Sequence, residues 1–234
     1  MAAKPIKICV IGNSHIASLK LGWDRIGRDF PTLELTFFGA RGYRMEQLQT
    51  QGEKLVPQTK ALKQILAHTS GSAGEINLPK YHACLVYGLF LRLPKMAPHL
   101  SAAVKSCVAA DALQASLSYE TLGKIRAASP IPVFVGHDPL TCFKGETRPA
   151  IPYTEALAYL RAAVDLADVR ILEQPKHTLE QDRFTRSSYL SGAIKLEQQE
   201  TAPREDQPDD NMGHMNGDFG AEFLRAALPL FTVN

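Results

Sequence analysis

Short apolar runs alternate along the chain with longer segments in which apolar residues recur at helical spacing. The run IKICVIG at 6–12 is almost continuously apolar and ends in glycine, as expected of a parallel strand that is buried on both faces. Similar or weaker runs recur further along the chain. The predicted strands are 6–12, 33–39, 82–91, 131–136 and 169–175.

Segments with helical periodicity lie between and after these strands. Strands that are separated by helices imply right-handed crossovers and a parallel sheet with helices on both faces. We therefore expect one α/β domain over 1–234, built in three layers around a mostly parallel five-stranded sheet. The predicted helices are 15–28, 44–67, 98–127, 154–167 and 217–231.

Two polar stretches interrupt this pattern. The stretch HTSGSAGEINLPK (68–80) consists largely of small and polar residues and predicts a flexible loop. The stretch EQQETAPREDQPDD (197–210) has six acidic residues and one arginine, which favours a flexible, solvated surface loop. Because it leads directly into a histidine-containing motif, a mobile flap over a site is the alternative.

Composition narrows the partners and the compartment. The formal net charge is +2 and no run of arginine and lysine stands out, so nucleic acid is not an expected partner. We identify neither a signal peptide nor an apolar stretch long enough to span a bilayer, and expect no membrane partner. The cysteines show no C-x-x-C spacing, and we expect a reduced, cytoplasmic protein. They are Cys9, Cys84, Cys107 and Cys142.

Chemistry-bearing residues follow the predicted strands. In parallel sheets, ligands bind beyond the carboxyl ends of the strands, so residues at those positions are candidates for a common site. The candidates are Asn13, Ser14 and His15; Gly39, Arg41 and Gly42; Gly88 and Arg92; His137 and Asp138; and, before the last helix, Asp209, Asp210, His214 and Asp218.

Ser14, Asp210 and His214 suit nucleophilic catalysis. A serine hydroxyl is a poor nucleophile until a histidine accepts its proton, a carboxylate orients that histidine and N–H donors stabilise the oxyanion. Ser14 at a strand-to-helix turn would expose its hydroxyl near the helix N-terminus. His214 and Asp210 would supply the base and the carboxylate.

These residues resemble motifs of the SGNH/GDSL hydrolase superfamily. VIGNSH matches its first block with Ser14 as nucleophile, FFGARGYRMEQL its second with Gly42 as oxyanion donor, and DNMGHMNGDFG its last with His214 as base. The resemblance covers nearly the whole chain by element order and implies a flavodoxin-like fold. It also implies ester cleavage or acyl transfer through an acyl-enzyme.

The chain departs from the family pattern at two positions. Phe90 stands where the third block has its oxyanion asparagine, and we keep Asn13 only as a candidate for the oxyanion or substrate site. Asn211 stands where the family has its aspartate, three residues before His214. Asp210 lies four residues before His214. We favour Asp210 because an aspartate can stabilise the imidazolium and an asparagine cannot.

Other roles remain open for several of these residues. Ser14 can serve as a helix cap, and His15 as a residue of the cap or of a pocket wall. Arg41 and Arg92 can be solvated or can bind an anionic substrate group, and we interpret His137 with Asp138 as a rim or structural pair. No recognised spacing supports a metal site, so we expect none.

The predicted function is hydrolysis of an ester, in which a short acyl group leaves a small-molecule or carbohydrate substrate. The enzyme would be a serine esterase or deacetylase in which Ser14 attacks, His214 carries the proton and Asp210 orients His214. The N–H groups of Ser14 and Gly42 would stabilise the oxyanion, and no cofactor is required. The alternatives are an acyltransferase that uses an acyl-thioester donor, with Arg41 and Arg92 at its phosphate, and a non-catalytic binding domain.

Overall fold

The computed structural model describes residues 4–143, 145, 149–193 and 213–232. Its central sheet contains five strands, all parallel, in the order β2-β1-β6-β7-β8. This is the strand order of flavodoxin-like folds, and it confirms the predicted fold class. The strands are β1 (Ile6–Gly12), β2 (Leu33–Gly39), β6 (Ala83–Tyr87), β7 (Val133–Gly136) and β8 (Val169–Leu172).

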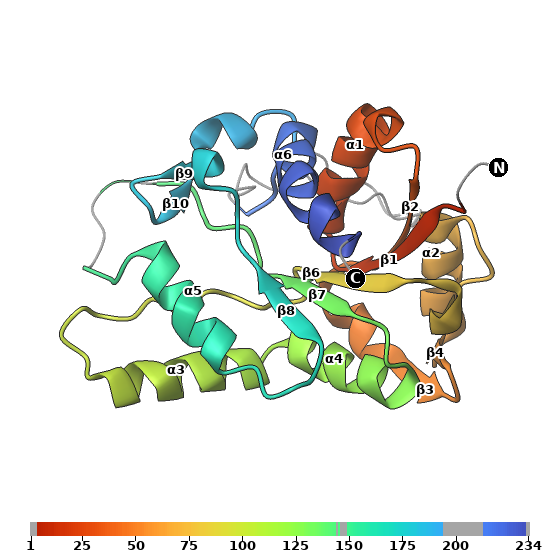
Figure 1. Cartoon of the computed structure of the whole chain (residues 1–234), viewed down its shortest axis with the longest axis horizontal. Helices are drawn as coiled ribbons and strands as arrows, with labels where there is room; N and C mark the ends of the chain where they lie inside the picture. Colours follow the sequence, from red (N-terminus) through yellow and green to blue (C-terminus); the bar gives the residue numbers. More distant parts are fainter. Residues whose placement is uncertain (1–3, 144, 146–148, 194–212, 233–234) are drawn as a thin grey trace.

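Both faces of the sheet are buried, which explains the continuous apolar runs. Ile8 and Val10 of β1 belong to a core with helices α1 and α6, whereas Cys9 and Ile11 belong to a core with α2, α3, α4 and α5. Figure 1 shows α1 and α6 on one side of the sheet and α3, α4 and α5 on the other. The helices are α1 (Ile16–Ile26), α2 (Lys60–Ser70), α3 (Ala102–Gln114), α4 (Leu117–Ala128), α5 (Tyr153–Ala162) and α6 (Gly217–Ala227).

The helix predicted over 44–67 is wrong for most of its length. The segment contains strands β3 (Leu48–Gln51) and β4 (Lys54–Pro57), which pair antiparallel as a hairpin, and α2 begins only at Lys60. Gly52 takes φ +58 at the hairpin turn, and Thr59 caps α2 by accepting the N–H of Leu62.

The prediction of one helix over 98–127 and of a loop over 68–80 also needs correction. Ser116 separates α3 from α4, because its hydroxyl accepts the N–H of Tyr119 and starts a new helix. Strand β5 (Ile76–Asn77) joins the hairpin, and Ile76 and Leu78 are fully buried. The short strands β9 (Leu179–Glu180) and β10 (Phe184–Thr185) pair with each other.

Short 3₁₀ helices connect several of these elements. They are η1 (Gly27–Asp29), η2 (Gly42–Gln47), η3 (Leu78–Lys80), η4 (Lys176–Thr178), η5 (Ser187–Tyr189) and η6 (Leu228–Phe231). No helix in the described ranges has the length and apolar character needed to cross a membrane. The predicted acidic loop at 197–210 lies outside the described residues, and the assignment of the chain to one domain stays a prediction.

Candidate functional site

The strand register aligns the candidate residues at one edge of the sheet. Gly12 at the end of β1 pairs with Gly39 of β2 on one side and with Tyr87 of β6 on the other. Tyr87 in turn pairs with Gly136 of β7. The segments that follow these four strands therefore lie side by side, and the β1–β6 boundary is the topological switch point at which such sheets bind ligands.

The Ser14 hydroxyl lies in the turn between β1 and α1. Its Oγ is 2.8 Å from Nε2 of His214, a hydrogen-bonding distance. The cap position of α1 is His15, which makes no side-chain capping hydrogen bond. The Ser14 hydroxyl thus contacts an imidazole, and the helix-cap interpretation of Ser14 does not hold.

Close packing of α1 against α6 brings Ser14 and His214 together. Ser14 lies two residues before α1 and His214 three residues before α6, so the relative position of the two helices sets the separation of the two side chains. Glycines stand where the helices meet: a Cβ on Gly220 would overlap the Ser18 carbonyl, and one on Gly22 would overlap the backbone at Ala221.

Asn216 fixes the entry of the chain into α6. Its Oδ1 accepts the N–H groups of Asp218 and Phe219, both at 3.1 Å, which caps the helix. Its Nδ2 donates to the Ser191 carbonyl at 2.9 Å, and its side chain is buried. Asn216 therefore connects the first turn of α6 to the segment that contains Ser191, and this fixes the chain close to His214.

The turn after β6 has an unusual backbone. Gly88, Leu89 and Phe90 all have positive φ, at +74, +52 and +62, which is strained for the two residues with side chains. A Cβ on Gly88 would lie 2.6 Å from Oδ1 of Asn13, so the glycine makes room for the asparagine. That oxygen accepts the N–H of His15 at 3.0 Å, which leaves the Asn13 amide NH₂ as its donor group.

His15 packs against the imidazole of His214. The ring centroids are 5.0 Å apart with an interplanar angle of 25°. Burial lowers the pKa of His15 to about 3, helped by the charges of His214 and Arg92, and its Nδ1 is buried without a hydrogen-bond partner. His15 is therefore neutral near pH 7, and only His214 in this stacked pair is placed to take the serine proton.

The segment after β2 covers the carboxyl end of β1. Gly42, at φ +60, begins η2, and the first N–H groups of a helix have no acceptor within it. Tyr43 is 63% exposed, and its ring stacks on Phe90 with centroids 4.0 Å apart. Because β2 and β6 flank β1, this aromatic pair joins the segments on either side of the Ser14 turn. Arg41 is half-buried and does not line the cavity described next.

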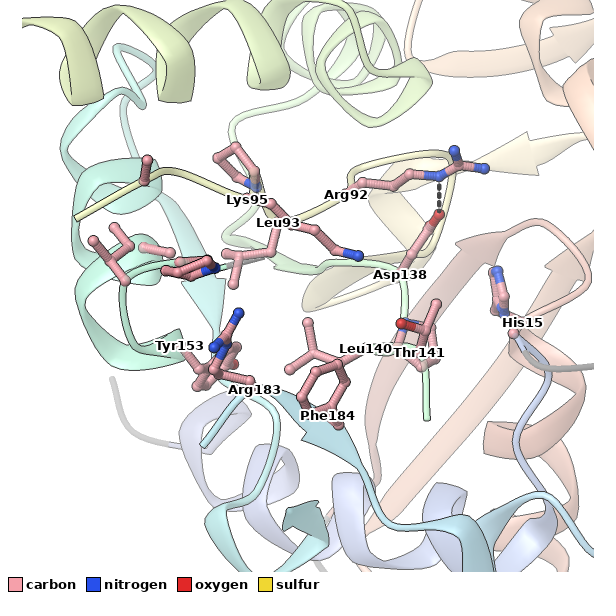
Figure 2. A pocket seen from close by; sticks show the side chains of 18 residues that line it. His15, Arg92, Leu93, Lys95, Asp138, Leu140, Thr141, Tyr153, Arg183 and Phe184 are labelled. Carbon is pink, nitrogen blue, oxygen red and sulfur yellow. Dashed lines mark ion pairs between the residues drawn. The ribbon is translucent and has the colours of Figure 1, made fainter. Parts of the chain in front are cut away.

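A cavity of about 1040 Å³ opens beside the serine–histidine pair. Its wall includes His15 and Gly213, and extends over the segments after β6 and β7 to the start of α5 and to β10. Figure 2 shows Lys95 and Arg183 among the side chains that extend into this space. Apolar and proline side chains form much of the remaining wall.

Arg92 and Asp138 form an ion pair in the wall of this cavity, drawn as a dashed line in Figure 2. Arg92 Nε lies 3.6 Å from Asp138 Oδ2; the arginine side chain is 78% exposed and the aspartate 11%. Burial raises the pKa of Asp138 to about 6, although Arg92 and the Phe90 backbone N–H act in the opposite direction. The second carboxylate oxygen is buried without a hydrogen-bond partner.

His137 belongs to the protein interior. Its Nδ1 lies 2.6 Å from the Asp138 carbonyl and its Nε2 lies 3.0 Å from the Tyr153 hydroxyl. A carbonyl only accepts, so Nδ1 carries the proton and Nε2 accepts the tyrosine O–H. Burial lowers the pKa of His137, which keeps this neutral form. His137 is thus a structural residue, whereas its neighbour Asp138 faces the cavity.

The carboxylate assigned to His214 cannot be located in this structure. Asp209, Asp210 and Asn211 lie outside the described residues, so the choice between Asp210 and Asn211 stays a prediction. Within the described ranges, no group of three or more His, Cys, Asp and Glu side chains is arranged to hold a metal ion.

The sequence located the serine and histidine but missed most of the cavity. Lys95, Arg183 and Tyr153 line it, yet none of them directly follows a strand that the sequence predicts. The signal available for Lys95 was its place in the LRLPK segment shortly after Arg92. Arg183 lies next to β10, which is too short to give an alternating pattern.

Comparisons with known proteins extend the description of the fold. No protein-family model matches the chain, and no curated protein matches it. Among solved structures, the chain is similar to the periplasmic domain of a lipopolysaccharide acetyltransferase of Salmonella ser. Paratyphi A, with 13% identity and a TM-score of 0.50. The match covers 99% of this chain and 85% of that chain. The protein therefore shares its fold with a domain of an acetyltransferase, and its membership of the SGNH/GDSL superfamily stays a prediction.

Proposed function

We propose that the protein cleaves esters by forming an acyl-enzyme on Ser14, and that water accepts the acyl group. One observation carries the proposal: Ser14 Oγ lies 2.8 Å from His214 Nε2 at the carboxyl end of β1. A hydroxyl this close to a neutral imidazole can pass its proton to the ring as it attacks a carbonyl carbon.

The proposed reaction has two balanced halves. In the first, Ser14 Oγ bonds to the ester carbonyl carbon, its proton moves to His214 Nε2, and the alcohol leaves with that proton. In the second, water attacks the acyl-serine, gives its proton to His214 and releases the acid, with the proton returning to Ser14. His15 stays neutral throughout, because burial keeps its pKa near 3.

Several supporting roles belong to the same proposal. The N–H groups of Ser14 and Gly42 would bind the oxyanion, with the Asn13 amide as a further candidate donor. Asp210 would orient His214 and stabilise its cationic form. Arg92 would contribute to substrate binding from the cavity wall.

A fluorophosphonate probe tests the nucleophile. We expect one covalent adduct, mapped by mass spectrometry to the peptide that contains Ser14. The adduct should be absent in Ser14→Ala and strongly reduced in His214→Gln. Ester turnover should also be lost in Ser14→Ala, because removal of a serine nucleophile lowers kcat by on the order of 10⁶ in a well-studied protease. Ser72→Ala, which removes an exposed hydroxyl away from the site, is the matched control. Labelling that persists in Ser14→Ala would contradict the proposal.

The cavity supports acyl transfer to a second substrate as the other candidate. A volume of about 1040 Å³ is far larger than a short acyl group requires, so an acceptor alcohol has room beside Ser14. The similar Salmonella domain is named as part of an acetyltransferase. If the protein is a transferase, added sugar acceptors will speed release of the first alcohol and divert the acyl group from water. Thiol release from acetyl-CoA would identify a thioester donor. The absence of both labelling and turnover would leave a binding domain.

A further inference from the structure

Three cationic side chains line the cavity beside Ser14. They are Arg92, Lys95 and Arg183, and among the described residues that line the cavity Asp138 is the only acidic one. Asp138 is paired with Arg92 at 3.6 Å, so its charge is directed to one of the three cations. The described side chains of the wall therefore include three cations and one carboxylate, a composition that favours a negatively charged occupant.

Lys95 is the cation of this wall that is best placed to bind an anion. In the ranges that the structure describes, no carboxylate lies within ion-pair distance of its ammonium group. Figure 2 shows the Lys95 side chain reaching from the segment after β6 toward the middle of the cavity. Leu93, Leu140 and Phe184 belong to the same wall. Lys95 itself is exposed, so its ammonium group is accessible to an anion that enters from solvent.

The cavity lies next to the serine–histidine pair, although neither Ser14 nor His214 lines it. His15 lines it and stacks on His214, whose Nε2 contacts Ser14. A carbonyl placed at Ser14 Oγ would therefore lie close to the cavity, with His15 between them in the wall. A short acyl group would leave most of the volume empty, so we place the alcohol portion of the ester in the cavity.

We propose that this cavity binds the alcohol portion of the substrate and that this portion carries a carboxylate or phosphate group. The proposal rests on the ester-cleaving function proposed above. Lys95 and Arg183 contact the anionic group, while Arg92 is held by Asp138 at the end of the cavity nearest His15. The apolar wall contacts the carbon skeleton that joins the anion to the ester oxygen.

Matched aryl acetates test the charge preference. Para-acetoxybenzoate and para-acetoxybenzamide have nearly the same shape, but only the first carries a negative charge, and para-acetoxyphenyl phosphate supplies the phosphate. We expect kcat/KM for the better anionic ester to exceed that for the amide by at least about tenfold, mainly through a lower KM. A tenfold ratio corresponds to about 1.4 kcal/mol. The ranking of the two anionic esters distinguishes a carboxylate site from a phosphate site.

Variants assign the preference to the cavity. Lys95→Gln and Arg183→Gln should each lower kcat/KM for the anionic ester more than for the amide, so that the preference for the anionic ester falls several-fold. Lys176→Gln, which removes an exposed cation outside the cavity, should leave it intact. Equal kcat/KM for charged and neutral esters in the wild type, or a preference that survives in both cavity variants, would overturn the proposal.

A binding measurement separates this proposal from the proposed function. Para-hydroxybenzoate, para-hydroxyphenyl phosphate and para-hydroxybenzamide can be titrated into the Ser14→Ala variant by calorimetry, because none of them needs to react. Selective binding of an anion without any ester turnover would refute ester cleavage and support the anion site. Turnover of all three acetates at equal rates would refute the anion site and support ester cleavage.

Discussion

The position of the Asn13 side chain requires that residue 88 has no side chain. The turn after β6 takes positive φ at Gly88, and the space that a side chain would fill is occupied by the Asn13 amide oxygen. That oxygen accepts the N–H of His15, which follows Ser14 in the chain. We therefore expect a side chain at position 88 to displace Asn13, and the lost hydrogen bond from the His15 N–H to shift the neighbouring Ser14.

We expect Gly88→Ala to impair the site more than the fold. The alanine adopts an unfavourable φ at a cost of about 1–3 kcal/mol, and it also displaces Asn13. The labelling rate of Ser14 by a fluorophosphonate should fall at least tenfold, measured at a temperature where the variant is folded. Gly71→Ala is the control, since Gly71 has φ +65 and open space around its Cβ position. Equal labelling of the two variants would refute the link from Gly88 to Ser14.

At the scale of elements, the site depends on how closely α1 and α6 approach. The helices touch at Gly22 and Gly220, where any side chain would meet the backbone of the other helix. Helix–helix separation is normally set by the side chains at the contact, so glycines allow an unusually close approach. The distance from Ser14 to His214 therefore depends on Gly22 and Gly220, which have no reactive side chain.

Gly220→Ala tests this dependence. The added methyl group meets the Ser18 carbonyl and must push α6 away from α1, with an expected destabilisation of about 1–3 kcal/mol. We expect kcat for any accepted ester to fall at least tenfold, because the base moves away from the hydroxyl. Gly123→Ala, in α4 with open space around it, should raise stability by about 0.5–1 kcal/mol and leave kcat unchanged. Unaltered kcat in Gly220→Ala would show that the helix contact does not position the pair.

The elements also show what the sequence could predict. The central strands β1, β6 and β7 are buried on both faces and the edge strands β2 and β8 are largely apolar, so apolar runs predict all five. The β3–β4 hairpin was missed because Leu48 and Leu55 fit helical spacing equally well. Ser14 and His214 could be found because each adjoins a predicted helix. The charge balance of the cavity could not be predicted from the sequence, because Lys95 and Arg183 are distant in sequence and come together only through the loops between elements.

For the whole molecule, buried ionisable groups make stability depend on pH in opposing directions. His15 and His137 have lowered pKa values, so below about pH 6.5 the unfolded chain binds protons that the folded chain does not, and acid destabilises the fold. Asp138 has a raised pKa of about 6, so between about pH 4 and 6 the folded chain binds the extra proton. Asp138 therefore lowers stability as pH rises through this window.

Asp138→Asn should reveal that contribution. The amide cannot ionise, so the variant avoids the cost of a buried carboxylate at neutral pH. We expect its free energy of unfolding, relative to wild type, to be greater at pH 7.5 than at pH 4 by up to about 3 kcal/mol, at about 1.4 kcal/mol per pKa unit. Urea unfolding at the two pH values measures the difference. The lost ion pair should matter little, because Arg92 is largely exposed. A relative stability that is the same at both pH values would contradict the raised pKa.

The contact between α1 and α6 also has a consequence for the order of events during folding. Ser14 and His214 are 200 positions apart in the chain, so their side chains meet only after the segment that contains His214 has been synthesised and α6 has docked. A nascent chain that ends before His214 lacks the imidazole that lies 2.8 Å from the Ser14 hydroxyl in the folded protein. If Ser14 is the nucleophile that we propose, it becomes reactive only once α6 has docked. In a refolding experiment, the onset of covalent labelling would time that final docking step.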